Sequence, residues 1–254
     1  MHLETIVDRL DSELNTDAFS AIDGSPNGLQ VTRPLGSIST AAVAVDAAAS
    51  TIDTAITRDA ELLITHHGLW WDGIERVTGP TYRRLESLIR NDVALYVSHL
   101  PLDAHQTIGN AAVIAADLKL VDREPFGRLD GEFIGQQGRF ETPISRTGFI
   151  DSVAEILPDS ASPHILPHGP ETIETVGIIT GSGVDWIDEA SSLGLDMLVT
   201  GEGKHSAYHA SKESDLNVLL GGHYATETGG VRAIAGMLSE WGIETTFIDE
   251  PSGL

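Results

Sequence analysis

The chain has 254 residues, enough for one large domain or two smaller ones, and it contains no cysteine. Disulfides, zinc–thiolate sites and cysteine nucleophiles are therefore excluded, and any metal would have to be held by histidine, carboxylate or water. Acidic residues outnumber basic ones by 38 to 15, and the formal net charge of −23 at pH 7 disfavours binding to nucleic-acid phosphates.

The same composition gives expectations about location. No run approaches the ~20 apolar residues that span a membrane, and the first residues, MHLETIVDRLDSELN, lack the basic-then-apolar layout of a signal peptide. We therefore expect a soluble, cytoplasmic protein. The basic residues include only three lysines, a pattern typical of halophilic proteins, in which salt screens repulsion beyond about 3 Å at 1 M.

Hydrophobic periodicity predicts alternating helices and strands. A helix over residues 2–14 precedes a polar segment with glycine and proline over 20–30. Strands are then expected at 41–45, 61–65 and 94–98, and helices near 48–58, 80–91 and 107–117. An extended region at 128–140 and a helix at 145–157 follow. A second series has strands at 175–180, 196–200, 217–221 and 244–248, with helices near 184–193, 204–213 and 226–240.

This alternation predicts an α/β fold with largely parallel sheets. Residues 41–67 also align without a gap on residues 176–202, and the later pair His99 and Asp103 has the same spacing as His223 and Glu227. We therefore predict two similar three-layer α/β lobes related by internal duplication, with a metal centre between them. The lobes would comprise residues 1–125 and 126–254, and the final helix and strand could pack back on the first.

Five side chains that can bind metal or carry protons directly follow predicted strands: His66, His67, His99, Glu202 and His223. In parallel sheets the carboxyl ends of the strands share one crevice, where ligands gather. Because neighbouring residues on a strand point to opposite faces, His66 and His67 would reach different ions. The sequence therefore favours a site with two metals.

Two carboxylates complete this predicted site. Glu227 lies four residues after His223 and Asp103 four residues after His99, which places each pair on one face of a first helical turn. Pro101 is compatible with that turn. Either carboxylate could bridge two cations, and mixed imidazole and carboxylate ligation suits Zn, Mn or Fe(II).

Other motifs leave alternatives open. The Gly181–Gly183 turn could be a tight turn or an anion cradle, and Trp70 and Trp71 could stack on a substrate or pack against protein. Three histidines, His105, His205 and His209, could either be exposed on helices or support the site and its substrate. We assign no role to His164 and His168.

Five motifs together resemble the Nif-three-like family of dinuclear-metal-centre hexameric proteins, whose members are called type-2 GTP cyclohydrolase I: NGLQV (27–31), ITHHGLWW (64–71), SHLPLDAHQTIGNA (98–111), TGEGKH (200–205) and GGHYATE (221–227). The resemblance extends from about residue 3 to about residue 250. It implies two divalent ions per subunit and a toroidal homohexamer. This chain would be a short form, without the domain that longer members insert between the lobes.

Carried over by position, the resemblance implies metal ligands at His66, His67, Asp103, His223 and Glu227. His99 and Glu202 become candidates for proton transfer. The expected function is a metal-dependent hydrolase acting on a small molecule, with GTP as the substrate that the family name implies. The alternative is a non-catalytic ring that stores or senses metal or serves as a scaffold. A nucleic-acid clamp conflicts with the net charge.

Overall fold

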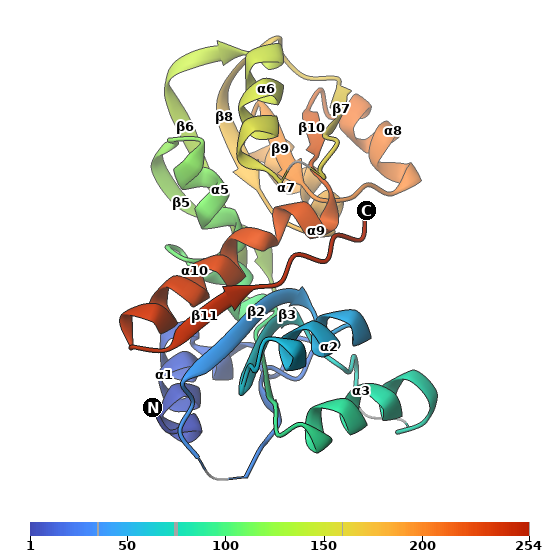
Figure 1. Ribbon diagram of the computed structural model, residues 1–254. Coiled ribbons are helices and arrows are strands. Elements are labelled where there is room, and N and C mark those ends of the chain that lie inside the picture. The colour runs from blue at the N-terminus through green and yellow to red at the C-terminus, as the bar shows by residue number, and fades with distance from the viewer. Residues whose placement is uncertain (35, 74–75, 159, 254) are drawn as a thin grey trace. The chain divides into compact units, whose positions relative to one another are not determined.

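A computed structural model describes residues 1–34, 36–73, 76–158 and 160–253. The chain forms two compact units, Met1–Leu102 with Gly230–Glu250, and Asp103–Gly229 with Pro251–Leu254. Each unit has its own sheet with helices packed against it (Figure 1), which confirms the predicted α/β fold class. Within the described part of the chain, no helix is both long and apolar enough to cross a membrane.

The first unit contains a five-stranded sheet in the order β1-β4-β3-β2-β11. Strands β2, β3, β4 and β11 are parallel, and β1 pairs antiparallel with β4. The strands are β1 (Gly28–Val31), β2 (Thr40–Asp46), β3 (Leu62–His67), β4 (Ala94–Val97) and β11 (Glu244–Phe247). The helical elements are α1 (Leu3–Leu14), η1 (Thr16–Phe19), α2 (Ala49–Thr57), α3 (Gly79–Arg90), α4 (Leu100–Ala104), which runs into the second unit, and α10 (Thr228–Glu240), which begins there.

Helices cover both faces of this sheet. One core cluster joins Ala42 and Leu63 of the sheet to Ile52 of α2 and Leu88 of α3. On the other face the Tyr96 hydroxyl of β4 donates to Asp11 of α1. Every third or fourth residue of α1 is buried, the spacing that defines one helix face.

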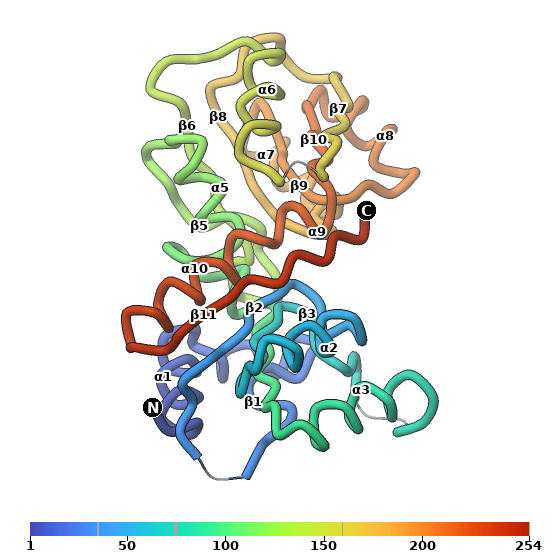
Figure 2. The backbone as a smooth tube through the Cα atoms, in the orientation of Figure 1, coloured from blue at the N-terminus to red at the C-terminus, as the bar shows by residue number. Residues whose placement is uncertain are grey.

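The second unit contains a six-stranded sheet in the order β5-β6-β8-β9-β10-β7, in which only β8, β9 and β10 are parallel. The strands are β5 (Val121–Leu129), β6 (Glu132–Ser145), β7 (His164–Pro167), β8 (Thr172–Ile178), β9 (Met197–Thr200) and β10 (Asn217–Leu220). The helical elements are α5 (Asn110–Asp117), α6 (Arg146–Ile156), η2 (Gly183–Trp186), α7 (Ile187–Ser192), α8 (His205–Glu213) and α9 (His223–Thr226). The trace in Figure 2 makes the long β5–β6 hairpin easy to follow.

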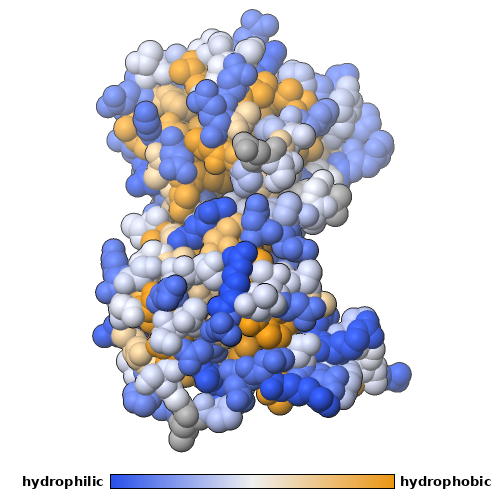
Figure 3. All heavy atoms as spheres, viewed as in Figure 1, coloured by the Kyte–Doolittle hydropathy of each residue, from blue (hydrophilic) through white to orange (hydrophobic). Residues whose placement is uncertain are grey.

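Helices α5 and α6 cover one face of the second sheet. Ile114 and Phe149 from these helices join Val176, Val199 and Leu219 of the sheet in one apolar cluster. The Ser145 hydroxyl caps α6 by accepting a hydrogen bond from the Gly148 amide. Figure 3 shows apolar side chains gathered around β6 and α6, where Phe140, Ile144 and Ile150 are only partly buried.

The two sheets share a strand pattern. Each sheet contains three parallel strands in chain order, β2-β3-β4 in the first and β8-β9-β10 in the second. An earlier strand pairs antiparallel with the last of the three: β1 pairs with β4, and β7 pairs with β10. This arrangement is what an internal duplication would require. The duplication and the boundary at residues 125 and 126 stay predictions.

Glu61, just before β3, ties that strand to the start of β2. Its carboxylate accepts hydrogen bonds from the Ser39 amide at 2.6 Å and hydroxyl at 2.7 Å, and from Arg33 at 3.0 Å. Burial raises the pKa of Glu61, but these bonds outweigh it and lower the pKa to about 2. The folded state therefore stabilises the ionised form of the Glu61 carboxylate.

We expect Glu61→Gln to lower the free energy of unfolding by about 1 kcal/mol at pH 7, a modest value because the ion pair is partly exposed. Because the pKa of Glu61 is lower in the folded state, its ionised carboxylate stabilises the fold above the unfolded pKa of 4.5. This stabilisation is lost as the pH falls through about 2. Urea unfolding of both proteins at pH 7, 4 and 3 should show the difference shrinking with acid. A difference that stays constant over this range would contradict the assignment.

Candidate metal centre

Three histidines of the first unit come together at the carboxyl ends of β3 and β4. His66 and His67 are the last residues of β3, and His99 follows β4 by two residues. One ring nitrogen from each lies within 4.8 Å of the others, and the ring centroids are 4.7 Å apart for His66–His67 and 5.1 Å for His66–His99. His66 is fully buried. This spacing allows the three imidazoles to approach one ion or two neighbouring ions.

Each ring is held through its Nδ1 atom. The acceptors are the Ser98 carbonyl for His66 (2.9 Å), Asp46 Oδ1 for His67 (2.8 Å) and Asp23 Oδ1 for His99 (2.8 Å). A carbonyl or carboxylate can only accept, so Nδ1 carries the hydrogen in all three rings and a neutral imidazole presents the Nε2 lone pair. Metal-binding histidines are oriented in this way in most proteins. The arrangement is therefore that of a prepared ligand set.

Asp23 is the most connected of these acceptors. In addition to His99 it accepts hydrogen bonds from Asn27 Nδ2 at 2.7 Å and from the amides of Ser25 and Leu100 at 2.8 and 3.0 Å. Burial raises the pKa of Asp23, yet the bonds from His99, Asn27 and Ser25 outweigh it and keep the pKa below its usual range. A fixed negative charge thus orients His99.

The structure differs from the sequence analysis at His66 and His67. Strand alternation predicted that the two rings would point apart, and the strand was expected to end at Thr65. Strand β3 instead continues to His67, which pairs with Asp46 of β2, and the chain leaves the sheet there. Alternation does not separate the rings at this strand end. No role was predicted for Asp23 and Asp46, although Asp46 directly follows the apolar run AVAV.

The second unit holds another group of candidate ligands. Asp103 is only 8% exposed, and its Oδ1 accepts hydrogen bonds from Asn110 Nδ2 at 2.8 Å and Thr180 Oγ1 at 3.1 Å. Two donors on one oxygen fix the orientation of the carboxylate. Metal-binding carboxylates are commonly supported in this manner.

His223 and Glu227 form the pair that their spacing predicted. Glu227 is 3% exposed, and its Oε2 lies 3.3 Å from His223 Nε2. Glu202 approaches the other ring nitrogen, with Oε1 3.4 Å from His223 Nδ1, and accepts a hydrogen bond from Ser182. The hydrogen bond to Glu227 outweighs burial and, with the charges of both glutamates, raises the pKa of His223 to about 9. The hydrogen bond from Ser182, together with the charge of His223, holds the pKa of Glu202 below its usual range despite its partial burial.

A glycine makes room for Glu227. Gly181 has φ +59°, and a Cβ built on it would collide with Glu227 Oε1 and lie 3.3 Å from His223 Nε2. The backbone of this turn is therefore a cradle that a side chain would fill. A buried carboxylate beside an imidazole, in space kept clear by glycine, fits a divalent cation in donor type and burial. This geometry gives the Gly181–Gly183 turn a role in accommodating the carboxylate.

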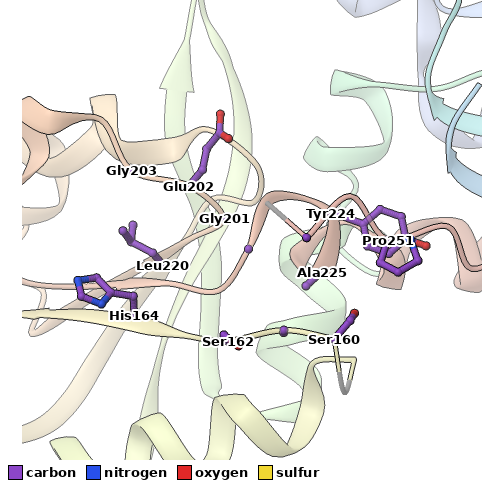
Figure 4. Close-up of a pocket in the computed structure, with 13 residues that line it drawn as sticks. Ser160, Ser162, His164, Gly201, Glu202, Gly203, Leu220, Tyr224, Ala225 and Pro251 are labelled. Atoms are coloured by element: carbon purple, nitrogen blue, oxygen red, sulfur yellow. The ribbon is translucent and has the colours of Figure 1, made fainter. Parts of the chain in front are cut away.

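The other residues singled out from the sequence lie elsewhere. His105 accepts hydrogen bonds from the Thr107 and Ile108 amides, and His205 and His209 are exposed on α8. Lys204 pairs with Asp185 at 2.5 Å. His164, which had no assigned role, lines a cavity together with Glu202 (Figure 4).

The two tryptophans have different surroundings. Trp70 is partly buried against the apolar core of the first unit. Trp71 is 48% exposed, and its ring meets the His99 ring edge-on at a centroid distance of 4.9 Å and lies 5.8 Å from the His67 ring. Trp71 therefore forms part of the rim of the histidine cluster.

The fold and these side chains define a class: an α/β protein with histidine and carboxylate clusters suited to metal binding at strand ends. The sequence matches the family Duf34/NIF3 (NGG1p interacting factor 3) over residues 1–252. It is 45% identical to a "GTP cyclohydrolase 1 type 2 homolog" of Halobacterium salinarum and 40% identical to one of Pyrococcus horikoshii, with full coverage of both chains in each case. The chain therefore belongs to the Duf34/NIF3 family.

Solved structures agree with this assignment. The crystal structure of TTHA1606 from Thermus thermophilus superposes with a TM-score of 0.91 at 34% identity, and both chains are covered completely. Reduced HcgD from Methanocaldococcus jannaschii gives a TM-score of 0.84 at 25% identity, with 98% of each chain covered.

Proposed function

We propose that both units contribute to one dinuclear centre for divalent metal, with His66, His67, Asp103, His223 and Glu227 as ligands. The observation that carries this proposal is the histidine cluster of the first unit, in which each ring is held through Nδ1 and one nitrogen of each ring lies within 4.8 Å of the others. The supported carboxylate of Asp103 and the glycine-cleared carboxylate of Glu227 add oxygen donors. This donor set suits Zn, Fe or Mn.

The activity that this centre best supports is hydrolysis of a small molecule. Two bound divalent ions would supply a water of lowered pKa and would polarise the group under attack. Glu202 would accept a proton, because its carboxylate is oriented by the hydrogen bond from Ser182 and lies 3.4 Å from the ring of the proposed ligand His223. His99, oriented by Asp23, would be the second group that moves a proton.

The names of the relatives extend this proposal to GTP as a substrate. Trp71 is placed to stack on a heterocyclic ring beside the histidines. Among the matching motifs the basic residue is Lys204, which already pairs with Asp185. Binding of a triphosphate would therefore need positive charges other than Lys204. Trp71 supports binding of the base more directly than any residue supports binding of the triphosphate.

One observation favours the alternative of a non-catalytic protein that stores or senses metal. His99 adds a further imidazole to the proposed ligands, and the extra donor would leave fewer positions for water. Filled coordination shells are typical of structural and storage sites, whereas an enzyme keeps an open position.

A substrate panel with the metal-loaded protein in molar KCl separates these functions. We expect metal-dependent turnover of a nucleotide, phosphoester or amide, lowered by about 10²- to 10⁴-fold in Glu202→Gln while the metal content stays unchanged. Glu213→Gln, an exposed change at the end of α8, is the matched control. If nothing in the panel is turned over, the storage or sensing function replaces the hydrolase. Unchanged turnover in Glu202→Gln would reject the role of Glu202 alone.

Trp71 should report on metal binding. We expect Co²⁺ to quench the tryptophan fluorescence of the protein, because a paramagnetic ion held by His67 would lie near the indole. Trp71→Phe should lose a large part of this quenching, and Trp241→Phe, at the end of α10, should keep it. Equal quenching in both variants would place the bound ion away from the histidine cluster.

We also propose a homohexameric ring, as the family resemblance implies. The partly buried apolar side chains around β6 and α6 offer surface that a second copy could cover. Light scattering after size-exclusion chromatography should give a mass of about six chains. A monomer at every protein and salt concentration would contradict the ring.

A further inference from the structure

The motif NGLQV (27–31) has no role in the proposed function, yet it lies beside the histidine cluster of the first unit. Strand β1, which contains most of this motif, pairs antiparallel with β4, and Gly28 is opposite Val97, two residues before His99. The pairing of the two strands ends at these residues. The backbone that carries His99 therefore needs hydrogen-bond partners other than a strand.

Asn27 supplies such partners for the His99 segment. Its Oδ1 accepts a hydrogen bond from the His99 amide at 2.7 Å, and its Nδ2 donates to Asp23 Oδ2 at 2.7 Å and to the Ser25 carbonyl at 3.2 Å. The other oxygen of Asp23, Oδ1, accepts the hydrogen bond from His99 Nδ1 at 2.8 Å. Asn27 therefore fixes both the backbone of His99 and the carboxylate that holds its ring.

Gln30 does the same for the segment that follows His67. Its Oε1 accepts a hydrogen bond from the Leu69 amide at 3.0 Å, and its Nε2 donates to the Pro26 carbonyl at 2.7 Å. Strand β4 lies between β1 and β3 in the sheet, so Gln30 reaches a segment two strands away. Because Leu69 follows His67 by two residues, this bond limits how far the end of β3 can move from β1.

Gly68 leaves room for the Gln30 carboxamide. A Cβ built on Gly68 would collide with Gln30 Nε2 and lie 2.8 Å from Oε1, and its three nearest atoms all belong to the Gln30 side chain. The φ of Gly68 lies outside the left-handed region, so space and not backbone conformation disfavours a side chain there. Gly68→Ala would therefore act on the Gln30 carboxamide without adding backbone strain.

We propose that Asn27 and Gln30 are positioning residues that set the separation of the His67 and His99 rings, whose centroids are 5.7 Å apart. This inference rests on the proposed metal centre and extends it to side chains that act through other residues. Functional side chains must be held within about 0.5 Å of their working geometry. By bonding to both histidine segments, one short motif holds the two strand ends at a fixed distance.

Ring separation and metal binding, measured on Asn27→Ala, Gln30→Ala and Gly68→Ala, test this inference. Crystal structures of the metal-free variants should show the His67 and His99 rings displaced by about 0.5 Å or more. Zn²⁺ affinity, measured by competition with a chromophoric chelator, should fall about 10- to 100-fold. The visible spectrum of bound Co²⁺ should change as well, because it reports the arrangement of the ligands. A role limited to stability would lower the urea midpoint of the metal-free protein and leave this spectrum unchanged.

Two further variants make the test specific. Asn91→Ala removes a carboxamide that bonds to the Ser87 carbonyl at the end of α3, and it should bind Zn²⁺ and Co²⁺ as the unchanged chain does. The double variant Gln30→Ala with Gly68→Ala should bind Zn²⁺ as Gln30→Ala alone does, because the group that the new Cβ would meet is absent. A much lower affinity in the double variant would show that Gly68 does not act through Gln30.

Unchanged ring positions and an unchanged Co²⁺ spectrum in Asn27→Ala and Gln30→Ala would overturn the inference, even if both variants unfold more easily. The metal-free crystal structures separate this result from failure of the proposed function. An unchanged chain that binds no metal would refute the metal centre, and displaced rings in the variants would still support the positioning role. Metal binding by the unchanged chain together with undisplaced rings in the variants would refute the positioning role alone.

Discussion

Replacing His67 by alanine should abolish the dinuclear centre while leaving the fold intact. His67 is held by Asp46 at 2.8 Å and lies next to the His66 and His99 rings, so its loss removes a donor that the neighbouring elements have already oriented. Loss of supporting groups alone costs about 10- to 100-fold in metal affinity, and loss of a ligand should cost more than about 100-fold. Elemental analysis after dialysis should show the bound metal falling from two ions per chain to one or none.

His209→Ala is the matched control for this experiment. It removes an exposed imidazole from α8 and should leave the metal content unchanged. Circular dichroism and the unfolding midpoint of the metal-free proteins should be the same for His67→Ala and the unchanged chain. A full complement of metal in folded His67→Ala would remove His67 from the ligand set.

Gly181→Ala should disable the same centre from the second unit without replacing a ligand. The new Cβ would collide with Glu227 Oε1, so the carboxylate would have to shift from its place beside His223. The positive φ of +59° also strains any residue with a side chain, by about 1–2 kcal/mol. We expect Zn²⁺ affinity, measured by competition with a chromophoric chelator, to fall at least tenfold.

Gly194→Ala separates the two effects of this substitution. Gly194 has a similar φ of +70°, but a Cβ there would meet no atom within 4 Å. Both variants should therefore unfold at reduced urea concentrations, Gly181→Ala at the lower one because of the collision, and only Gly181→Ala should lose metal affinity. Equal affinities in the two variants would show that Glu227 does not need its present position to bind metal.

Much of the fold could be predicted from the sequence because the elements around each core have strong periodicity. The run AAVAV in β2 and the apolar spacing of α1 leave little choice of structure. Two short strands, β1 and β7, were not predicted, because four residues carry too little periodicity, whereas the helical turns expected beside His99 and His223 are present as α4 and α9. Their placement depends on neighbouring strands and turns.

The candidate ligands were accessible to sequence analysis, and their supporting groups were not. The spacing of four between His223 and Glu227 predicted that they lie on one helix face, and His223 Nε2 lies 3.3 Å from Glu227 Oε2. Asp23 is separated from His99 by 76 residues, and no local pattern connects them. The role of Gly181 likewise depends on which strand ends meet, which only the folded chain shows.

Anomalous scattering from crystals of the Zn²⁺-loaded protein tests the central claim most directly. The proposed centre predicts two peaks per chain at the zinc edge, bound by Nε2 of His66 and His67, by His223, and by the carboxylates of Asp103 and Glu227. A single peak, or peaks at other side chains with these five residues unbound, would contradict a dinuclear centre built from both units.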